Sequence, residues 1–334
     1  MSTDTPSVTI KVYVITYRRP VLLKRALNSL LQQTHTTWIA EVINDDPDDL
    51  SVANLLADIN DSRIILSAPA VKRGGTQNFN YALKPTHEPF ATILEDDNWY
   101  EPTYLEMMLS ALQNNPGKMM AVGNQNIWIE GVDGSWTNSE RTIWKETTGT
   151  SFYRYQLKDK CGSAKICNSS MLWRTEPTRE WLTPDDIPID VTEHFRERII
   201  PHPILLVNTP LVNYAQTIHT NRSDGLVWSM YQVLLIASVF VNLTHHQADA
   251  LAGELWATAR NGNPLYKTAL LHSGLSHPKA GPLFKISTLK ERLRYALVWL
   301  KSPRVCYKAI KAPELLSSHF VFLINSLNNQ QIER

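Results

Sequence analysis

Several features that define other protein classes are scarce or absent in this sequence of 334 residues. The three cysteines, Cys161, Cys167 and Cys306, lack C-x-x-C spacing, which argues against a disulfide framework and a structural zinc site and favours a reducing, cytoplasmic compartment. The formal net charge is only +1, so charge gives no reason to expect a nucleic-acid partner. No G-x-G-x-x-G follows the first apolar run, which argues against a nicotinamide-dependent dehydrogenase. The length and composition leave a globular chain with room for one large domain and a smaller one.

Long uncharged runs are also rare. The N-terminal residues lack the charged start, apolar centre and cleavage site of a signal peptide, so we expect a mature start.

Residues 225–243 form a run of nineteen residues without a formal charge, but they include Ser229, Gln232 and Asn242 and barely reach the length of a membrane span. We therefore expect a buried or interfacial helix there, with a span as the alternative.

The first hundred residues alternate between strand and helix patterns. Short β-rich apolar runs are followed by amphipathic stretches with turn residues between them. The pattern predicts strands at 7–17, 38–45, 63–68 and 89–97, and helices at 18–34, 49–61 and 76–84. Such alternation predicts an α/β fold, a doubly wound and mainly parallel sheet with flanking helices.

Polar clusters follow three of these expected strands, at 16–19 (TYRR), 44–49 (NDDPDD) and 95–98 (EDDN). In a doubly wound sheet, ligands bind beyond the carboxyl ends of the strands, so these clusters are expected to converge. Each cluster could instead be a turn or a helix cap. The three adjacent acids Glu95, Asp96 and Asp97 fit that alternative least well, because carboxylates repel one another unless solvated or bound to a cation such as Mg²⁺ or Mn²⁺.

Four segments resemble, in order and at similar intervals, the nucleotide-binding half of family-2 glycosyltransferases with the GT-A fold. They are VYVITYRRPVLLKRALNSLLQQT, EVINDDPDD, RGGTQNFNYAL and ILEDDNWYEPTYLEMML. The resemblance covers about 7–110 well and continues loosely to 224. It implies a GT-A domain over 1–224, with a nucleotide-binding half at 7–110 and an acceptor half at 111–224. Residues 225–334 are then expected to form a helical C-terminal region, in contact with a membrane surface or another subunit.

The resemblance assigns roles to the first two strand ends. Thr16, Tyr17 and Arg18 correspond to the loop that wraps the nucleoside. Asp45 and Asp46 correspond to the paired acids of which one accepts a hydrogen bond from the base ring, most often uracil. A UDP-sugar is therefore the expected donor.

The third motif matches the family only in part. Gly74 and Asn80 correspond to its glycine and asparagine, and the resemblance implies that both lie at the nucleotide. Lys72 and Phe79 stand where asparagine and arginine are more usual, which leaves the base and phosphate contacts from this motif open.

The segment EDDNW corresponds to the D-x-D-D-W pattern of the family. Asp97 then stands at the acid that ligates the divalent metal, and Glu95 and Asp96 lie beside the nucleotide. Glutamate at the first acid is a departure, since it is longer by one methylene. The chemistry agrees, because a cation on the diphosphate neutralises the charge that grows as the glycosidic bond breaks.

A catalytic base is expected in the segment 167–199, which resembles the acceptor side of the family. Asp190 falls at the acidic position and, by the apolar spacing that follows, at a helix N-terminus. It is either the base that deprotonates the acceptor hydroxyl or only the N-cap, with Glu193 completing a capping-box-like pair. Glu193 and Asp186 are the other candidates for the base.

Residues 214–224 resemble the family segment that closes over the diphosphate. His219 is a candidate second metal ligand and Arg222 a candidate diphosphate clamp. The alternative for His219 is a solvated loop histidine.

Residues 279–312 contain nine lysines and arginines and one glutamate, a local net charge of +8, interleaved with apolar and aromatic residues. This composition suits the surface of an anionic membrane, although a solvated helical face is an equal alternative. A membrane contact would imply a lipid-linked or membrane-anchored acceptor.

The sequence thus predicts an inverting transferase that uses a nucleotide sugar and Mn²⁺ or Mg²⁺, with a glycan or lipid-linked acceptor. Inversion is implied by the resemblance alone. A glycosidase and a non-catalytic carbohydrate-binding or nucleotide-sugar-binding module are the alternatives. Metal-dependent release of nucleoside diphosphate distinguishes the transferase from both.

Overall fold

The computed structural model describes residues 8–176, 181–200, 202–218, 223–260 and 262–332. By its internal contacts the chain divides into two compact units. The sheet unit comprises Met1–Arg154, Lys165–Asp186 and Pro201–Thr220, and the helical unit comprises Tyr155–Ala164, Ile187–Ile200 and Asn221–Arg334. Two short segments of the expected domain 1–224 therefore group with the C-terminal helices.

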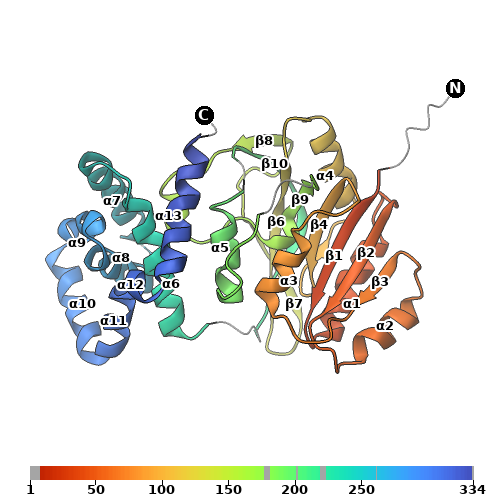
Figure 1. The fold of residues 1–334 in the computed structure, drawn as a ribbon, viewed down its shortest axis with the longest axis horizontal. Coiled ribbons are helices and arrows are strands. Elements are labelled where there is room, and N and C mark those ends of the chain that lie inside the picture. Colours follow the sequence, from red (N-terminus) through yellow and green to blue (C-terminus); the bar gives the residue numbers. More distant parts are fainter. Residues whose placement is uncertain (1–7, 177–180, 201, 219–222, 261, 333–334) are drawn as a thin grey trace. The chain divides into compact units, whose positions relative to one another are not determined.

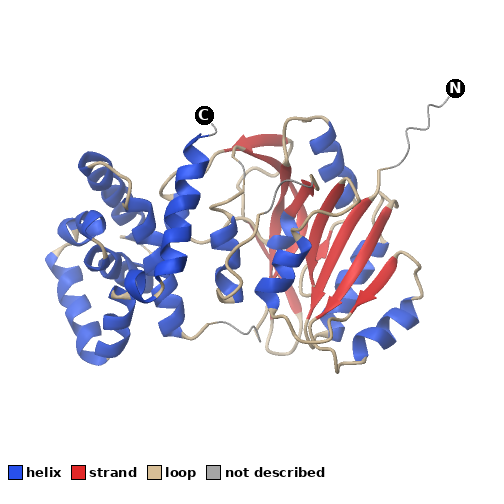
Figure 2. Ribbon diagram, in the orientation of Figure 1, coloured by secondary structure: helices blue, strands red, loops and turns tan. Residues whose placement is uncertain are grey.

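The sheet unit is built on a mixed sheet that has ten strands within the described residues (Figures 1 and 2). The strands run in the order β3-β2-β1-β4-β9-β6-β10-β5, with β7 beside β6 and β8 beside β10. Strands β1 to β4 pair in parallel, as do β6 and β10, whereas β5, β7, β8 and β9 pair antiparallel. The bounds are β1 Ile10–Thr16, β2 Trp38–Asn44, β3 Ile64–Ser67, β4 Phe90–Glu95, β5 Trp99–Tyr100, β6 Met120–Glu130, β7 Trp136–Thr142, β8 Thr150–Tyr153, β9 Met171–Arg174 and β10 Ile204–Gln216.

Helices cover both faces of this sheet. Ile10, Val12 and Val14 of β1 share one buried core with residues of α1, α2 and α4. Between them, Tyr13 points to the opposite face, where its ring meets that of Tyr81 in α3 at 6.0 Å. Since side chains alternate along a strand, the single strand β1 packs against helices on both faces. The bounds are α1 Pro20–Leu31, α2 Ser51–Ile59, α3 Gly75–Ala82 and α4 Tyr104–Gln113.

The strand and helix alternation expected over residues 7–97 is confirmed, with boundaries that differ by a few residues. The strand ends at Thr16, Asn44 and Glu95 coincide with the three polar clusters. Because β1 lies between β2 and β4 and all three run in parallel, these clusters meet at one edge of the sheet.

The helical unit is organised around α6, Gly225–Phe240, which packs against α8, α11, α12 and α13. Most residues of α6 from Tyr231 onward are buried, so the interpretation of 225–243 as a buried helix is confirmed. None of the described helices combines the length and apolarity needed to cross a membrane. The other bounds are α5 Thr192–Arg196, α7 His245–Ala259, α8 Pro264–Ser276, α9 Gly281–Ile286, α10 Leu289–Lys301, α11 Pro303–Ile310, α12 Ala312–Leu315 and α13 Ser317–Ile332.

Candidate active site

The three acids after β4 form a tight turn in which each carboxylate faces a different part of the sheet unit. Glu95 turns toward the segment before β9. Its carboxylate accepts hydrogen bonds from Asn168 Nδ2 at 3.2 Å, Ser169 Oγ at 3.0 Å and Asn98 Nδ2 at 3.2 Å. The backbone N–H of Glu95 donates to the same Ser169 hydroxyl at 3.0 Å. The longer side chain of glutamate is therefore held by two residues that the sequence motifs did not include.

Asp96 faces the carboxyl end of β1. Its Oδ2 accepts a hydrogen bond from Thr16 Oγ1 at 2.9 Å and a longer one from the backbone N–H of Tyr17 at 3.4 Å. Both Asp96 and Thr16 are buried. These two side chains therefore fix the β4 turn to the loop after β1, and the Thr16 hydroxyl is engaged within the protein.

Asp97 is held by two arginines of the β1–α1 region. Arg19 Nη1 donates to Asp97 Oδ2 at 3.0 Å and lies 3.4 Å from Asp96 Oδ1. Arg25 Nη2 donates to the backbone carbonyl of Asp97 at 2.6 Å. Arg19 thus balances part of the carboxylate charge, whereas Arg25 holds the backbone of the turn.

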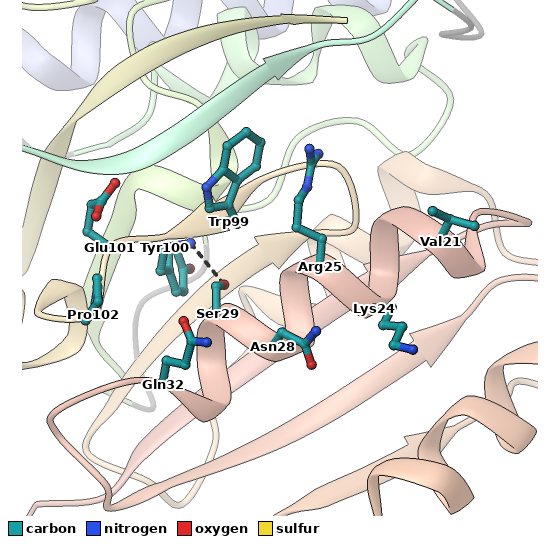
Figure 3. A pocket seen from close by; sticks show the side chains of 10 residues that line it. All are labelled: Val21, Lys24, Arg25, Asn28, Ser29, Gln32, Trp99, Tyr100, Glu101 and Pro102. Carbon is teal, nitrogen blue, oxygen red and sulfur yellow. Dashed lines mark hydrogen bonds between the residues drawn. The ribbon is translucent and has the colours of Figure 1, made fainter. Parts of the chain in front are cut away.

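Arg25 is itself clamped by aromatic rings. Its guanidinium carbon lies 3.9 Å from the ring centre of Trp99 and 4.1 Å from that of Trp136. Figure 3 shows Arg25 and Trp99 extending side by side above α1, next to a surface depression of about 570 Å³. Burial lowers the pKa of Arg25 to about 10, so the group remains cationic at neutral pH. None of the residues predicted for the site lines this depression.

The acidic turn carries more negative charge than its surroundings favour. Burial, together with the charge of Asp97, raises the pKa values of Glu95 and Asp96 to about 7. Burial also raises the pKa of Asp97, while Arg19 opposes that shift. Desolvation and like charges both disfavour ionised carboxylates. An added cation would therefore be stabilised at this turn.

The turn fits a divalent cation in its donor chemistry. Among the described residues, no group of three or more histidine, cysteine, aspartate or glutamate side chains is arranged to hold a metal. Mg²⁺, however, is commonly held by one or two carboxylates together with substrate phosphates. The Asp97 carboxylate provides such a hard oxygen donor, so metal binding by Asp97 stays a prediction that suits the residues present.

Asp45, at the end of β2, organises the loop before α3. Its carboxylate accepts hydrogen bonds from the backbone N–H groups of Arg73 at 2.9 Å and Gly74 at 3.1 Å. Gly74 has φ of +90°, a conformation that favours glycine. The predicted acid and the predicted glycine therefore lie together, joined by a contact within the protein.

Charged and aromatic groups gather at the end of β1. Lys72 Nζ lies 3.7 Å from the ring centre of Tyr17, and the guanidinium of Arg18 lies 5.1 Å from it. Arg18 Nε also donates a short hydrogen bond to Asp46, which holds the pKa of that carboxyl below its usual value. The predicted Tyr17, Arg18 and Asp46 thus form one cluster. Lys72, a departure from the family pattern, is part of it.

Asn80 is engaged by a different loop. Its Nδ2 donates to the carbonyl of Thr183 at 2.8 Å and to Asp185 Oδ1 at 2.6 Å, and its Oδ1 accepts from the backbone N–H of Thr183 at 3.1 Å. Phe79 is buried. The structure brings Asn80 to the 183–185 loop, and its predicted contact with the nucleotide stays a prediction.

Asp190 and Glu193 belong to the helical unit. The expectation that Asp190 is an N-cap is wrong: it lies in a 3₁₀ turn, Ile189–Val191, and Val191 precedes α5 without a side-chain cap. The Asp190 carboxylate instead accepts hydrogen bonds from Ser223, from its backbone N–H at 3.0 Å and its hydroxyl at 2.7 Å. Asp190 thus makes a long-range pairing with Ser223 in place of a local cap.

Three predicted residues remain: Asp186, His219 and Arg222. Asp186 is an exposed residue at the end of a segment of the sheet unit. His219 and Arg222, the predicted second metal ligand and diphosphate clamp, lie outside the described residues.

Comparison with known proteins agrees with these motifs. Residues 11–175 match the family Glycosyl transferase family 2. A relative from Escherichia coli, the UDP-Glc:alpha-D-GlcNAc-diphosphoundecaprenol beta-1,3-glucosyltransferase WfgD, is 28% identical over 118 residues, which are 35% of this chain and 46% of the relative. The matched stretch thus spans less than half the length of that relative.

Solved structures support the fold independently of close sequence similarity. The S. aureus protein TarS, determined alone and in complex with UDP, aligns with 98% of this chain and 92% of its own, with a TM-score of 0.55 and 15% sequence identity. At that identity the likeness concerns the fold. The family match over 11–175, with the motifs at the strand ends, therefore identifies a family-2 glycosyltransferase domain in this chain, and the likeness to TarS agrees with its GT-A fold.

Proposed function

We propose that this glycosyltransferase transfers a sugar from a UDP-sugar, with inversion and with Mn²⁺ or Mg²⁺, to a hydroxyl of a glycan or lipid-linked acceptor in cell-surface polysaccharide assembly. The observation that carries the proposal is the turn Glu95–Asp97, where three carboxylates with raised pKa values lie at the carboxyl edge of the sheet. A diphosphate with its cation is a ligand that this charge distribution suits.

The relatives support the donor and the acceptor class. The name of WfgD gives a UDP-glucose donor and a diphosphoundecaprenol-linked acceptor. TarS has been solved with UDP and with UDP-GlcNAc. We infer the same nucleotide and a lipid-linked or glycan acceptor for this chain.

In this proposal, Asp97 would hold the metal, and Glu95 would lie beside the nucleotide. The metal, when bound, supplies positive charge that stabilises the departing diphosphate. Arg19 and Arg25 keep the Asp97 side chain and backbone in place. Asp96 keeps the turn joined to the β1 loop.

The nucleoside side of the proposed site is the cluster at the ends of β1 and β2. Tyr17 offers a ring, and Lys72 and Arg18 add positive charge next to it. Asp45 and Asp46 remain the predicted base contacts. Asp45 would have to bind the base beside its hydrogen bonds to the α3 loop.

The acceptor hydroxyl must lose a proton as it attacks, and a positioned carboxylate contributes roughly 10²–10⁴-fold to such a step. We keep Asp190 as the first candidate for this base, with Glu193 and Asp186 next. The two hydrogen bonds from Ser223 hold the Asp190 carboxylate in a fixed orientation. Replacing Asp190 by Asn is expected to abolish transfer and preserve UDP binding. Transfer at the wild-type rate would remove the assignment.

The proposal is tested by incubating the purified chain with a panel of UDP-, GDP- and dTDP-sugars and measuring released nucleoside diphosphate. Release that requires Mn²⁺ or Mg²⁺ and stops with EDTA is expected for a UDP-sugar. Equal release in EDTA would overturn the metal requirement, and release from only a GDP- or dTDP-sugar would overturn the choice of base.

A lipid-linked acceptor is presented at a membrane. We therefore infer a peripheral contact between the chain and the inner face of the plasma membrane, through residues 279–312. Their local net charge of +8 is the support for this contact.

A further inference from the structure

Helix α10 carries a row of leucines on its solvent-exposed side. Leu289, Leu293, Leu297 and Leu300 are spaced by four, four and three residues, which places them along one side of the helix. Their exposed fractions are 73%, 60%, 58% and 79%. Single exposed leucines are common, but a contiguous row on one helix marks a surface that binds something.

The opposite side of α10 fixes this orientation. Tyr295 is buried in the core of the helical unit. Arg292 donates hydrogen bonds to the carbonyls of Phe284 and Lys285 at 3.0 and 2.8 Å. A capping box between Thr288 and Glu291 defines where the helix begins. The leucines are therefore held outward by contacts on the other side of the helix.

Cations border the leucine row. Lys290, Arg294 and Lys301 are exposed and, at 100° per residue, lie along one flank of it. The following helix α11 adds the exposed Arg304 and Lys308. Glu291, the one acid between residues 279 and 312, is used in the capping box. Apolar and positive side chains thus form a continuous surface, which we call the α10 face: the four leucines with Lys290, Arg294 and Lys301.

The charge of the α10 face indicates which kind of partner binds it. A second copy of the chain would bring one +8 segment against another, and this repulsion opposes self-association. An anionic lipid surface complements both features, since acyl chains accept the leucines and phosphate headgroups accept the cations. The geometry is that of a helix lying in the plane of the interface.

We propose that α10 lies in the surface of an anionic membrane, with Leu289, Leu293, Leu297 and Leu300 among the acyl chains and Lys290, Arg294 and Lys301 at the lipid phosphates. This inference specifies which residues make the membrane contact of the proposed function, and it rests on that function for the reason why the chain would bind a membrane. Its support, the exposure and spacing of the α10 face, is independent of the transfer chemistry.

The test is co-sedimentation of the full chain with vesicles of phosphatidylglycerol and phosphatidylcholine, compared with vesicles of phosphatidylcholine alone. We expect binding to the anionic vesicles only. The triple variant Lys290→Gln, Arg294→Gln, Lys301→Gln is expected to weaken it on the order of 100-fold, since each cation near the surface contributes roughly fivefold. The double variant Leu293→Gln, Leu297→Gln is expected to weaken it at least about tenfold.

A matched control is Leu265→Gln, a leucine of α8 that is 70% exposed and lies outside the α10 face. It is expected to bind vesicles as the wild type does. Equal binding to neutral vesicles, or binding unchanged in both α10 variants, would overturn the proposal. Concentration-dependent self-association that the leucine variant abolishes, with no vesicle binding, would also overturn it and assign the face to a second copy.

Failure of this inference is distinguishable from failure of the proposed function. Nucleoside diphosphate released from a donor in the absence of membranes reports on the transfer chemistry and does not require the α10 face. Vesicle binding without release from any donor would remove the proposed function and keep the α10 face as a membrane surface. Release without vesicle binding would keep the proposed function and remove the α10 face as a membrane surface.

Discussion

The two units of this chain enclose charged side chains of opposite sign, and these side chains have different effects on stability. The sheet unit crowds three carboxylates together, with Asp96 buried and Glu95 and Asp97 half-buried. The helical unit buries Arg198, whose Nη2 donates to the carbonyls of Lys160 and Leu235 at 2.7 and 2.8 Å. Crowded acids lower stability, whereas a guanidinium that satisfies two buried carbonyls supports the fold. The comparison predicts that neutralising an acid removes function and neutralising the arginine removes stability.

The largest effect is expected for Asp97→Asn. Loss of the proposed metal ligand should lower kcat on the order of 10³-fold, as the loss of a major electrostatic stabiliser of a transition state does. In metal-free buffer the Tm should stay the same or rise, because one of three crowded charges is gone. Steady-state release of UDP and calorimetry provide the two measurements.

Asp58→Asn, an exposed acid of α2, is the control for that variant. It is expected to change neither quantity. An Asp97→Asn protein with full activity would end the assignment of the metal to this turn.

The next effect is expected for Arg198→Met in the helical unit. Two buried carbonyls lose a charged donor, so the free energy of unfolding should fall by about 3 kcal/mol. UDP binding per folded molecule should persist, because the nucleotide motifs lie in the other unit. Denaturant unfolding monitored by circular dichroism measures the change, and the exposed Arg294→Met should stay within about 0.5 kcal/mol of the wild type. Unchanged stability of Arg198→Met would contradict the structural role.

Arg25→Ala tests whether a cation of the sheet unit supports activity by holding the backbone of the proposed metal-binding turn in place. Removing the hydrogen bond to the Asp97 carbonyl should loosen the turn and raise the metal concentration for half-maximal activity by about tenfold, as loss of a group that orients a ligand commonly does. The kcat at saturating metal should change less. Arg25→Lys, which keeps the charge between the two tryptophans, should restore part of the affinity; equal loss in both variants would favour the planar guanidinium over charge.

The smallest effect is expected in the pH dependence of stability. The pKa of Glu95 is raised from 4.5 to about 7, so the folded state binds more protons there and stability falls as pH rises through this interval. In the helical unit, burial beside Arg198 lowers the pKa of Lys160 from 10.5 to about 7, so stability rises from about pH 7 upward. Glu95→Gln should flatten the first slope and Lys160→Met the second, measured as Tm against pH in EDTA. Identical profiles for the wild type and both variants would contradict these assignments.

Much of the sheet unit was predictable from sequence, because strand and helix periods alternate over residues 7–97 and acids mark three strand ends. The roles of Arg19, Arg25 and Ser169 were not predictable. They stand in segments that the sequence did single out, but their individual contacts join residues about 70 positions apart or more, and no local pattern shows which partner each side chain takes. Trp99 did carry a signal, since it completes the EDDNW motif.

The helical unit was harder to predict for a physical reason. The charge of residues 279–312 was evident, but a leucine row at helical spacing usually indicates the face that packs on a core. In α10 the core contact is made by Tyr295, and the leucines face outward. The partner of Asp190 was also not predictable, because Ser223 lies too far away in the sequence for a capping rule to identify it.

The burial of α6 has a consequence for how the chain is made. During synthesis this uncharged helix is complete many residues before α13, which packs against it and whose His319 lies 3.1 Å from the hydroxyl of Tyr231. Until then the part of its apolar surface that α13 covers stays exposed, and exposed apolar segments of this kind attract chaperones or aggregate. A chain shortened before Ser317 would carry the same liability permanently, so its yield would be limited by aggregation and not by loss of the sheet.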